Sequence, residues 1–315
     1  MSKIAFIFPG QGSQYIGMGK DFYEQKDKAR ELFDQADSFF PFSIKDICFE
    51  QNKLLNQTEY TQACLVTTCL SMLRVLKEEG VTPDITAGLS LGEYPALVAA
   101  GALSEEGAIK LVYKRGYYMA NEVPGGVGGM AAVLGLTSDV VECVCREVSN
   151  EQNEIVEPAN YNCPGQIVIS GTKRGIELAT EKLKEKKARR VIPLVVSGPF
   201  HSSLLKGAGE KLREELEVTS FSPLQVPYVC NVSAETISDS SRCKELLVRQ
   251  VYSGVRWEQC IHTMIDFGVE TFIEIGPGKT LNGFLRKIDK TKTVINIEHV
   301  EDLKQLEKLC VEGKA

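Results

Sequence analysis

The feature that most constrains this chain is a serine between two glycines, in Ile85-Thr-Ala-Gly-Leu-Ser-Leu-Gly-Glu-Tyr94. A short apolar stretch precedes Ser90, and a helix-prone stretch, Leu91 to Ala100, follows it. This spacing between a strand and a helix is typical of a nucleophile elbow, in which the glycines let neighbouring segments approach closely. The first N–H groups of the helix can stabilise an oxyanion. We predict that Ser90 is a nucleophile; the alternative is a serine that only caps the helix.

A second glycine-rich turn follows the first apolar run of the chain. Ile4–Phe8 has the length of a strand buried on both faces of a parallel sheet, and Pro9-Gly-Gln-Gly-Ser-Gln14 follows it. Because such a turn lies at the ligand-binding edge of the sheet, Gln11 is a candidate site residue; the alternative is a plain turn. The turn has neither P-loop nor dinucleotide spacing, and Gly276–Thr280 lacks the first P-loop glycine, so we expect no nucleotide site.

The middle of the chain predicts an inserted domain. After the glycine-rich segment Val123–Gly129, the expected order is strand, helix, strand, strand, helix, strand, over 130–134, 138–149, 155–160, 166–170, 173–187 and 191–196. This βαββαβ order is that of a ferredoxin-like unit. The remaining chain alternates strands with helices. We therefore predict an α/β protein whose large domain, with a parallel sheet, spans 1–127 and 198–315, and whose small ferredoxin-like domain spans 128–197.

Arg115 lies on an apolar face of a predicted helix over 104–122, together with Ala108, Val112 and Met119. A desolvated guanidinium is costly unless an anion accompanies it. The partner is either an acidic side chain in a structural salt bridge or a substrate carboxylate, which the planar guanidinium can bind bidentately.

Three histidines are available as the general base for a serine nucleophile. His262 lies in a helical run, and His299 lies near the C-terminal end. His201 follows Gly198-Pro-Phe at a strand-to-helix transition, where site residues collect, so we predict that His201 is the base. No acidic third member of a triad stands out, and a main-chain carbonyl is expected to orient the imidazole.

Composition excludes several classes of function. The net charge of −6 argues against general nucleic-acid binding. The ten cysteines form no Cys-x-x-Cys, and we expect buried, reduced thiols without disulfides or zinc. The first apolar run is too short for a signal peptide and no run could span a bilayer, so a cytoplasmic protein is expected. The basic run Lys182–Arg190 is either a solvated helix end or a docking patch for an acidic partner.

Seven short segments, spread over the whole chain, carry a resemblance to one family. They are Phe8-Pro-Gly-Gln-Gly-Ser-Gln14, Gly88-Leu-Ser-Leu-Gly-Glu-Tyr94, Lys114-Arg-Gly116, Asn160-Tyr-Asn-Cys-Pro-Gly-Gln166, Gly198-Pro-Phe-His201, Val248-Arg-Gln-Val251 and Glu274-Ile-Gly-Pro-Gly278. Together and in this order they resemble the malonyl-CoA:acyl-carrier-protein transacylases, which load malonyl units for fatty-acid synthesis. The resemblance implies an α/β-hydrolase-like large domain and a ferredoxin-like small one.

The resemblance also implies roles for the catalytic residues. Ser90 would be acylated, and His201 would take its proton while the main-chain carbonyl of Gln250 orients it. The N–H groups of Gln11 and Leu91 would form the oxyanion hole.

The resemblance also implies substrate-binding residues, and Gln250 is one of them. Arg115 would hold the malonyl carboxylate, and Asn160 and Arg190 would touch the CoA or phosphopantetheine arm. Phe200 resembles the malonyl-selecting form of its motif, which would crowd out methylmalonyl by about 1–3 kcal/mol. Leu89 stands where the family usually has histidine; because that histidine is not the base, activity is expected to survive.

The expected reaction is ping-pong transfer of malonyl from malonyl-CoA to an acidic acyl carrier protein, by a monomer without metal or redox cofactor. Three alternatives remain at this point. The chain could load a polyketide synthase carrier, hydrolyse acyl thioesters, or bind a carrier without catalysis. Arg115 argues against a hydrolase, because a plain esterase has no use for a buried cation.

Overall fold

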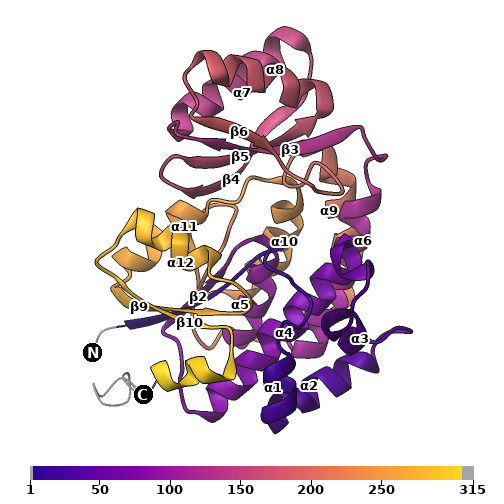
Figure 1. Cartoon of the computed structure of the whole chain (residues 1–315), viewed down its shortest axis with the longest axis vertical. Coiled ribbons are helices and arrows are strands. Elements are labelled where there is room, and N and C mark those ends of the chain that lie inside the picture. Colours follow the sequence, from indigo (N-terminus) through magenta and orange to yellow (C-terminus); the bar gives the residue numbers. More distant parts are fainter. Residues whose placement is uncertain (1–2, 307–315) are drawn as a thin grey trace.

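The strands form two separate sheets in the computed structural model, which describes residues 3–306 (Figure 1). The strands of the larger sheet lie in the order β10 (Thr293–Ile297), β9 (Val269–Ile275), β1 (Lys3–Phe8), β2 (Ile85–Gly88), β7 (Tyr228–Val229) and β8 (Thr236–Ile237). Neighbouring strands pair in parallel from β10 to β7, and β8 is antiparallel to β7. The parallel sheet predicted for the large domain is confirmed.

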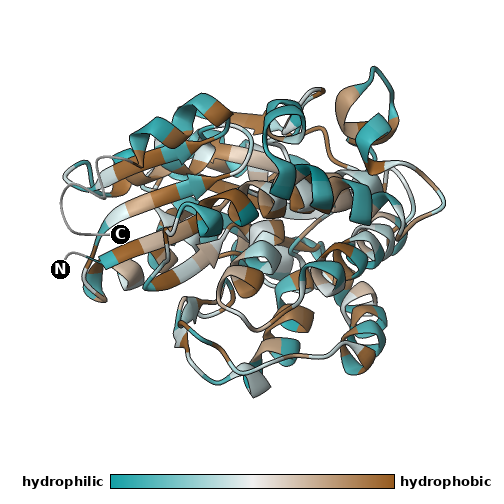
Figure 2. Ribbon diagram, turned by 90° about the horizontal axis from the view of Figure 1, so that it is seen from below, coloured by the Kyte–Doolittle hydropathy of each residue, from teal (hydrophilic) through white to brown (hydrophobic). Residues whose placement is uncertain are grey.

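Both faces of this sheet are buried, as the continuous apolar run of β1 predicts. Phe6 and Phe8 pack into one core, and Ala5 and Ile7 pack into a second core on the opposite face. Figure 2 shows the resulting apolar strands between more polar helix surfaces.

Helices cover the two faces unequally. The first core receives side chains from α1 (Lys20–Gln25), α2 (Asp27–Asp37), α3 (Ile44–Phe49), α4 (Thr58–Glu78), α5 (Glu93–Ala99), α6 (Glu105–Asn121), α9 (Lys206–Val218) and α10 (Cys243–Tyr252). The second core is covered by α11 (Trp257–Asp266) and α12 (Thr280–Ile288). Short 3₁₀ helices are η1 (Leu54–Asn56), η2 (Ser90–Gly92), η3 (Ser203–Leu205), η4 (Ser240–Arg242) and η5 (Val300–Gln305).

The smaller sheet is antiparallel, in the order β4 (Val156–Cys163), β5 (Gln166–Thr172), β3 (Gly128–Leu134) and β6 (Arg190–Pro193). Helices α7 (Ser138–Gln152) and α8 (Lys173–Glu185) pack on one face and form a third core. The predicted βαββαβ order is confirmed. On the opposite face Met130, Ala159 and Val168 join the first core of the large sheet, so this face is turned toward the rest of the protein (Figure 1).

The small sheet is tied to the larger structure at several points. A Cβ built on Gly128, at the start of β3, would lie 2.6 Å from Cγ of Pro199. The two segments that connect the small sheet to the rest of the protein therefore lie next to each other. Strand β4 also bonds to the loop after α10, because Val255 donates its N–H to Ala159 O (2.8 Å) and accepts one from Tyr161 (2.9 Å).

The chain from Lys20 to Asp37 forms two helices and not one, because Lys26 between them is extended (φ −127°, ψ 113°). Strand β7 is short and ends at Val229. The expectation that all cysteines are buried is wrong for Cys143, which is exposed on α7; the nine described cysteines are free thiols, and Cys310 lies outside the described residues.

Within residues 3–306, no helix combines the length and the apolar character needed to cross a membrane.

Candidate active site

The nucleophile candidate Ser90 lies in the tight turn η2 between β2 and α5. Its backbone is left-handed (φ 51°), which is strained for a residue with a side chain. The flanking glycines are required by space: a Cβ on Gly88 would lie 1.9 Å from C of Gly92, and one on Gly92 would lie 2.1 Å from O of Phe8. The geometry is that of the predicted elbow.

Two buried amides hold the strained serine. Asn231 accepts the Ser90 N–H through Oδ1 (2.7 Å) and donates from Nδ2 to Gly88 O (2.8 Å). Gln250 donates from Nε2 to Ser90 O (2.8 Å). That carbonyl belongs to the peptide whose N–H is that of Leu91, so Gln250 also fixes the orientation of a predicted oxyanion donor. Asn231 was not predicted from the sequence.

His201 lies against the serine hydroxyl. Its Nε2 is 2.7 Å from Ser90 Oγ, and its Nδ1 is 2.8 Å from the main-chain oxygen of Gln250. Since a carbonyl only accepts, Nδ1 carries the proton and Nε2 is free to accept one from Ser90. Burial, and then the positive charge of Arg115, lower the pKa of His201 to about 3. The imidazole is therefore neutral, as a general base requires.

Arg115 is 1% exposed, and its acceptors are all neutral. Nη1 donates to Gln62 Oε1 (2.9 Å), and Nη2 donates to Gln250 Oε1 (2.9 Å) and to Ser90 Oγ (3.0 Å). Within residues 3–306 Arg115 forms no ion pair, so the structure does not contain the salt bridge that was the alternative reading. Burial lowers the pKa of Arg115. Gln62, which the sequence analysis missed, fixes one end of the guanidinium.

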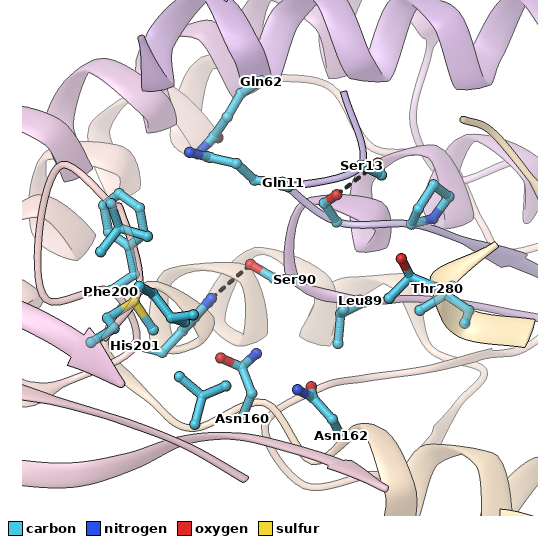
Figure 3. Close-up of a pocket in the computed structure, with 18 of the residues that line it drawn as sticks. Gln11, Ser13, Gln62, Leu89, Ser90, Asn160, Asn162, Phe200, His201 and Thr280 are labelled. Atoms are coloured by element: carbon cyan, nitrogen blue, oxygen red, sulfur yellow. Dashed lines mark hydrogen bonds between the residues drawn. The ribbon is translucent and has the colours of Figure 1, made fainter. Parts of the chain in front are cut away.

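These groups open onto one pocket between the two sheets (Figure 3). Gln11 and Gln62 lie on one side of it, and Asn160 and Asn162 lie on the other (Figure 3). The pocket is lined by Pro9, Gly10, Gln11, Gly12, Ser13, Gln62, Leu89, Ser90, Arg115, Met119, Met130, Asn160, Asn162, Val168, Leu194, Val196, Phe200, His201, Thr280, Leu281 and Phe284.

Three predicted site residues do not line this pocket. Gln250 is fully buried behind Ser90 and meets the site through Arg115 and His201. Leu91 is also buried, so only its main chain is placed to act. Arg190 is exposed at the start of β6.

A side chain of the protein itself bonds the first N–H groups of α12. The buried carboxylate of Glu274 accepts the N–H groups of Leu281 (3.0 Å) and Asn282 (2.8 Å), where a phosphate lies in a P-loop. These two N–H groups at the start of α12 are therefore already bonded to a side chain of the protein. Burial raises the pKa of Glu274 to about 7.

The basic run at the end of α8 is partly paired. Lys182 contacts Glu151 (2.7 Å) and Glu147 (3.4 Å) of α7. Within the described part of the chain no ion pair involves its other basic residues, Lys184, Lys186, Lys187, Arg189 and Arg190.

Comparisons with known proteins agree on one kind of enzyme. Residues 5–305 match the acyl transferase domain family. The chain is 50% identical to the malonyl CoA-acyl carrier protein transacylase of Bacillus subtilis (strain 168), over 96% of each chain. The crystal structure of the Clostridium perfringens transacylase of the same name superimposes with a TM-score of 0.95 at 44% identity, covering 99% of this chain and 98% of that one. A malonyl-transacylase in complex with its type II PKS acyl-carrier protein gives a TM-score of 0.93 at 37% identity, covering 98% and 100%.

Proposed function

The chain belongs to the malonyl CoA-acyl carrier protein transacylase family, and we propose that it moves malonyl from malonyl-CoA to the phosphopantetheine thiol of an acyl carrier protein. One observation carries this proposal. Ser90 Oγ lies 2.7 Å from His201 Nε2 and 3.0 Å from Arg115 Nη2, so a nucleophile, a neutral base and a cation with no acidic contact among residues 3–306 converge in one pocket.

The first half-reaction acylates the serine. His201 Nε2 takes the proton of Ser90 as Oγ attacks the thioester carbonyl, and the N–H groups of Leu91 and Gln11 stabilise the oxyanion. When the tetrahedral intermediate collapses, the carbon–sulfur bond breaks and CoA leaves as a thiol with the proton from His201. In the second half-reaction the phosphopantetheine thiol gives its proton to His201 and attacks the malonyl ester. The bond between the acyl carbon and Ser90 Oγ then breaks, and Oγ leaves with the proton from His201, which restores the free serine.

Arg115 selects the acyl group in this proposal. Its guanidinium is buried and already oriented by Gln62 and Gln250, so it can hold a carboxylate bidentately without reorganising. Fixing the malonyl group in a narrow site disfavours attack by water on the ester. A serine hydrolase gains nothing from this cation, and we therefore prefer transfer.

The remaining assignments follow from position. Asn160, on strand β4 of the small sheet, lines the pocket, and we propose that it touches the CoA or phosphopantetheine arm. Arg190 is exposed and does not line the pocket, so we propose that it touches the same arm outside the pocket. Phe200 would limit the space beside the malonyl carbon, and Leu89 replaces the family's usual histidine with an apolar wall. We also propose that residues 128–197 are a separate domain.

The physiological setting is part of the proposal. We propose that the protein is a monomer in the cytoplasm. We also propose that it needs no metal or redox cofactor, because Ser90, His201 and Arg115 together supply the nucleophile, the base and the anion site. A fatty-acid carrier is the favoured partner. A polyketide carrier is the second candidate, because a structural neighbour was solved with one.

Carrier docking can be tested on the unpaired part of the basic run. Lys186→Glu with Lys187→Glu should raise KM for the carrier and leave malonyl-CoA loading unchanged, because an acidic carrier would meet these charges and malonyl-CoA would not. Lys182→Glu is a poor choice because Lys182 pairs with Glu151 and Glu147. Unchanged KM for the carrier would contradict docking at this run.

The function itself is tested by intact mass after brief mixing with malonyl-CoA. We expect a malonyl adduct on the wild type, none on Ser90→Ala, and a weak one on Arg115→Ala. An acetyl adduct from acetyl-CoA without a malonyl adduct would overturn the role of Arg115. Free malonate without an adduct would instead indicate a hydrolase.

A further inference from the structure

A second buried charge lies directly behind the elbow. Glu93 is the first residue of α5, its side chain is fully buried, and it is not among the residues that line the pocket. A buried carboxylate is costly unless a cation or several donors compensate it. Its surroundings therefore decide what it does.

An amide joins this carboxylate to the acyl-selecting cation. Gln250 accepts from Arg115 Nη2 through Oε1 (2.9 Å) and donates from Nε2 to Glu93 Oε2 (2.7 Å). The amide dipole thus lies with its negative end toward the guanidinium and its positive end toward the carboxylate. Arg115 and Glu93 form a charge pair that is separated, and oriented, by one neutral side chain.

The contacts of Glu93 favour its ionised form. Oε2 accepts from Gln250 (2.7 Å) and from the N–H of Asn231 (3.2 Å), and both bonds lower the pKa of Glu93 because they favour the carboxylate. Burial raises the pKa of Glu93 to about 7, and the charge of Arg115 acts in the opposite direction. Above that pH the carboxylate carries its charge.

We propose that Glu93 is a positioning residue for Arg115: through Gln250 it supplies the counter-charge that holds the guanidinium in the free protein, and it thereby limits how tightly the pocket binds a carboxylated acyl group. This inference rests on the proposed role of Arg115. In the free protein the two charges cancel. A bound malonyl carboxylate adds a second anion, which Glu93 repels across the low-dielectric interior. The malonyl group is held by Arg115 yet can still be transferred.

The test measures binding of malonyl-CoA and acetyl-CoA in a Ser90→Ala background, in which no acyl-enzyme forms. Glu93→Gln keeps an oxygen for Gln250 and Asn231 but removes the charge. At about pH 8 we expect Kd for malonyl-CoA to fall about three- to tenfold, while Kd for acetyl-CoA stays the same. A merely structural role would weaken both ligands.

Glu274→Gln is the matched control, because Glu274 is also buried with a pKa raised to about 7 but bonds the start of α12. It should leave the ratio of the two Kd values unchanged. An unchanged malonyl Kd in Glu93→Gln, weaker binding of both ligands, or the same tightening in Glu274→Gln would each overturn the inference. Failure of the wild type to form a malonyl adduct would instead refute the proposed function.

A measurement without substitution at Glu93 covers the case in which Glu93→Gln does not fold. It uses the Ser90→Ala, Glu274→Gln background, which removes the other buried carboxyl with a pKa of about 7. Between about pH 6 and 8 the ratio of malonyl-CoA to acetyl-CoA Kd should rise as Glu93 ionises, and a flat ratio would refute the inference. The other groups that face Glu93 keep their charge state, because the phenols and thiols have raised pKa values and the guanidinium stays charged; they are Arg115, Tyr94, Tyr228, Cys230, Cys243 and Cys260.

Discussion

At the scale of single residues, the site combines a neutral base with a neighbouring cation. Arg115 serves the substrate carboxylate in our proposal, and its charge also disfavours protonation of His201. Burial acts in the same direction and is the larger cause. His201 therefore stays neutral at pH values where an exposed histidine would be charged. In our proposal one arginine thus both selects the acyl group and keeps His201 neutral.

The pH dependence of acylation should reveal this coupling. A base with a pKa near 3 loses activity only as the pH falls far below 6.5, and removing the Arg115 charge raises that pKa. Because burial remains, Arg115→Ala should restore only part of this shift, so its acetyl loading should begin to fall at a higher pH than that of Arg115→Lys, which keeps the charge. Rapid-mix intact mass with acetyl-CoA measures both profiles. Coincident profiles would show that this charge does not set the pKa of His201.

Phe200 gives a prediction on selectivity. Its side chain is 7% exposed and lines the pocket beside His201. Phe200→Ala should raise methylmalonyl loading relative to malonyl by about tenfold, since one methyl group in an apolar pocket is worth about 1–3 kcal/mol. Met130→Ala enlarges the same pocket from the small sheet and is the control. Equal gains in both variants would mean that Phe200 has no specific role.

Sequence reasoning found residues with a local signature and missed those without one. The elbow around Ser90, the turn before His201 and the arginine on an apolar helical face could each be recognised from neighbours in the chain. Asn231 lies 141 residues from Ser90, and Gln62 lies 53 residues from Arg115, so no local pattern connects them. Glu93 did leave one signal, because a charged residue inside the otherwise apolar stretch 91–100 needs a buried partner.

At the scale of elements, the strand–turn–helix unit depends on close backbone approach. The continuous apolar run of β1, the short apolar stretch of β2 and the glycine spacing made this unit predictable. The break at Lys26 was not predictable, since no proline or glycine marks it. The chain bends there in an extended residue between two short helices.

Two glycine substitutions separate packing from helix propensity. Gly92→Ala places a methyl group 2.1 Å from Phe8 O, so we expect a loss of at least about 3 kcal/mol in the free energy of unfolding and no malonyl adduct. Gly283→Ala, in α12, meets no atom within 4 Å and should gain about 1 kcal/mol. Chemical denaturation of both variants measures this. A stable, active Gly92→Ala would contradict the elbow geometry.

At the scale of the whole molecule, β4 connects the small sheet to the catalytic layer. Glu157 of β4 accepts the N–H of Ser203 through Oε2 (2.6 Å). Ser203 lies two residues after His201, and the backbone of His201 is left-handed (φ 59°). The same strand carries Asn160 into the pocket and bonds Val255. The small sheet thus helps to hold the turn that bears the base. Pairing over this distance could not be predicted from the sequence, although the order of the inserted strands could.

Removing this tie should affect acylation more than folding. Glu157→Ala deletes one hydrogen bond to a charged acceptor, which costs about 1.5–3 kcal/mol at most, and frees the turn after His201. We expect malonyl loading to fall severalfold with a small drop in Tm. Glu181→Ala, an exposed residue of α8, is the control. Equal loading rates in the two variants would show that β4 does not position His201.

The neighbouring entry and exit of the small sheet, at Gly128 and Pro199, have a consequence for how such enzymes diversify. A segment whose two ends lie side by side can be exchanged for another without changing the distance between its attachment points on the large-sheet part of the protein. The nucleophile, the base and the cation all stay behind in the large-sheet part, while the exchanged part brings its own wall of the pocket. Recombination at these two points would therefore present new acyl-carrying thiols and carriers to the same three groups, provided that the incoming segment keeps the bonds from β4 to Ser203 and Val255.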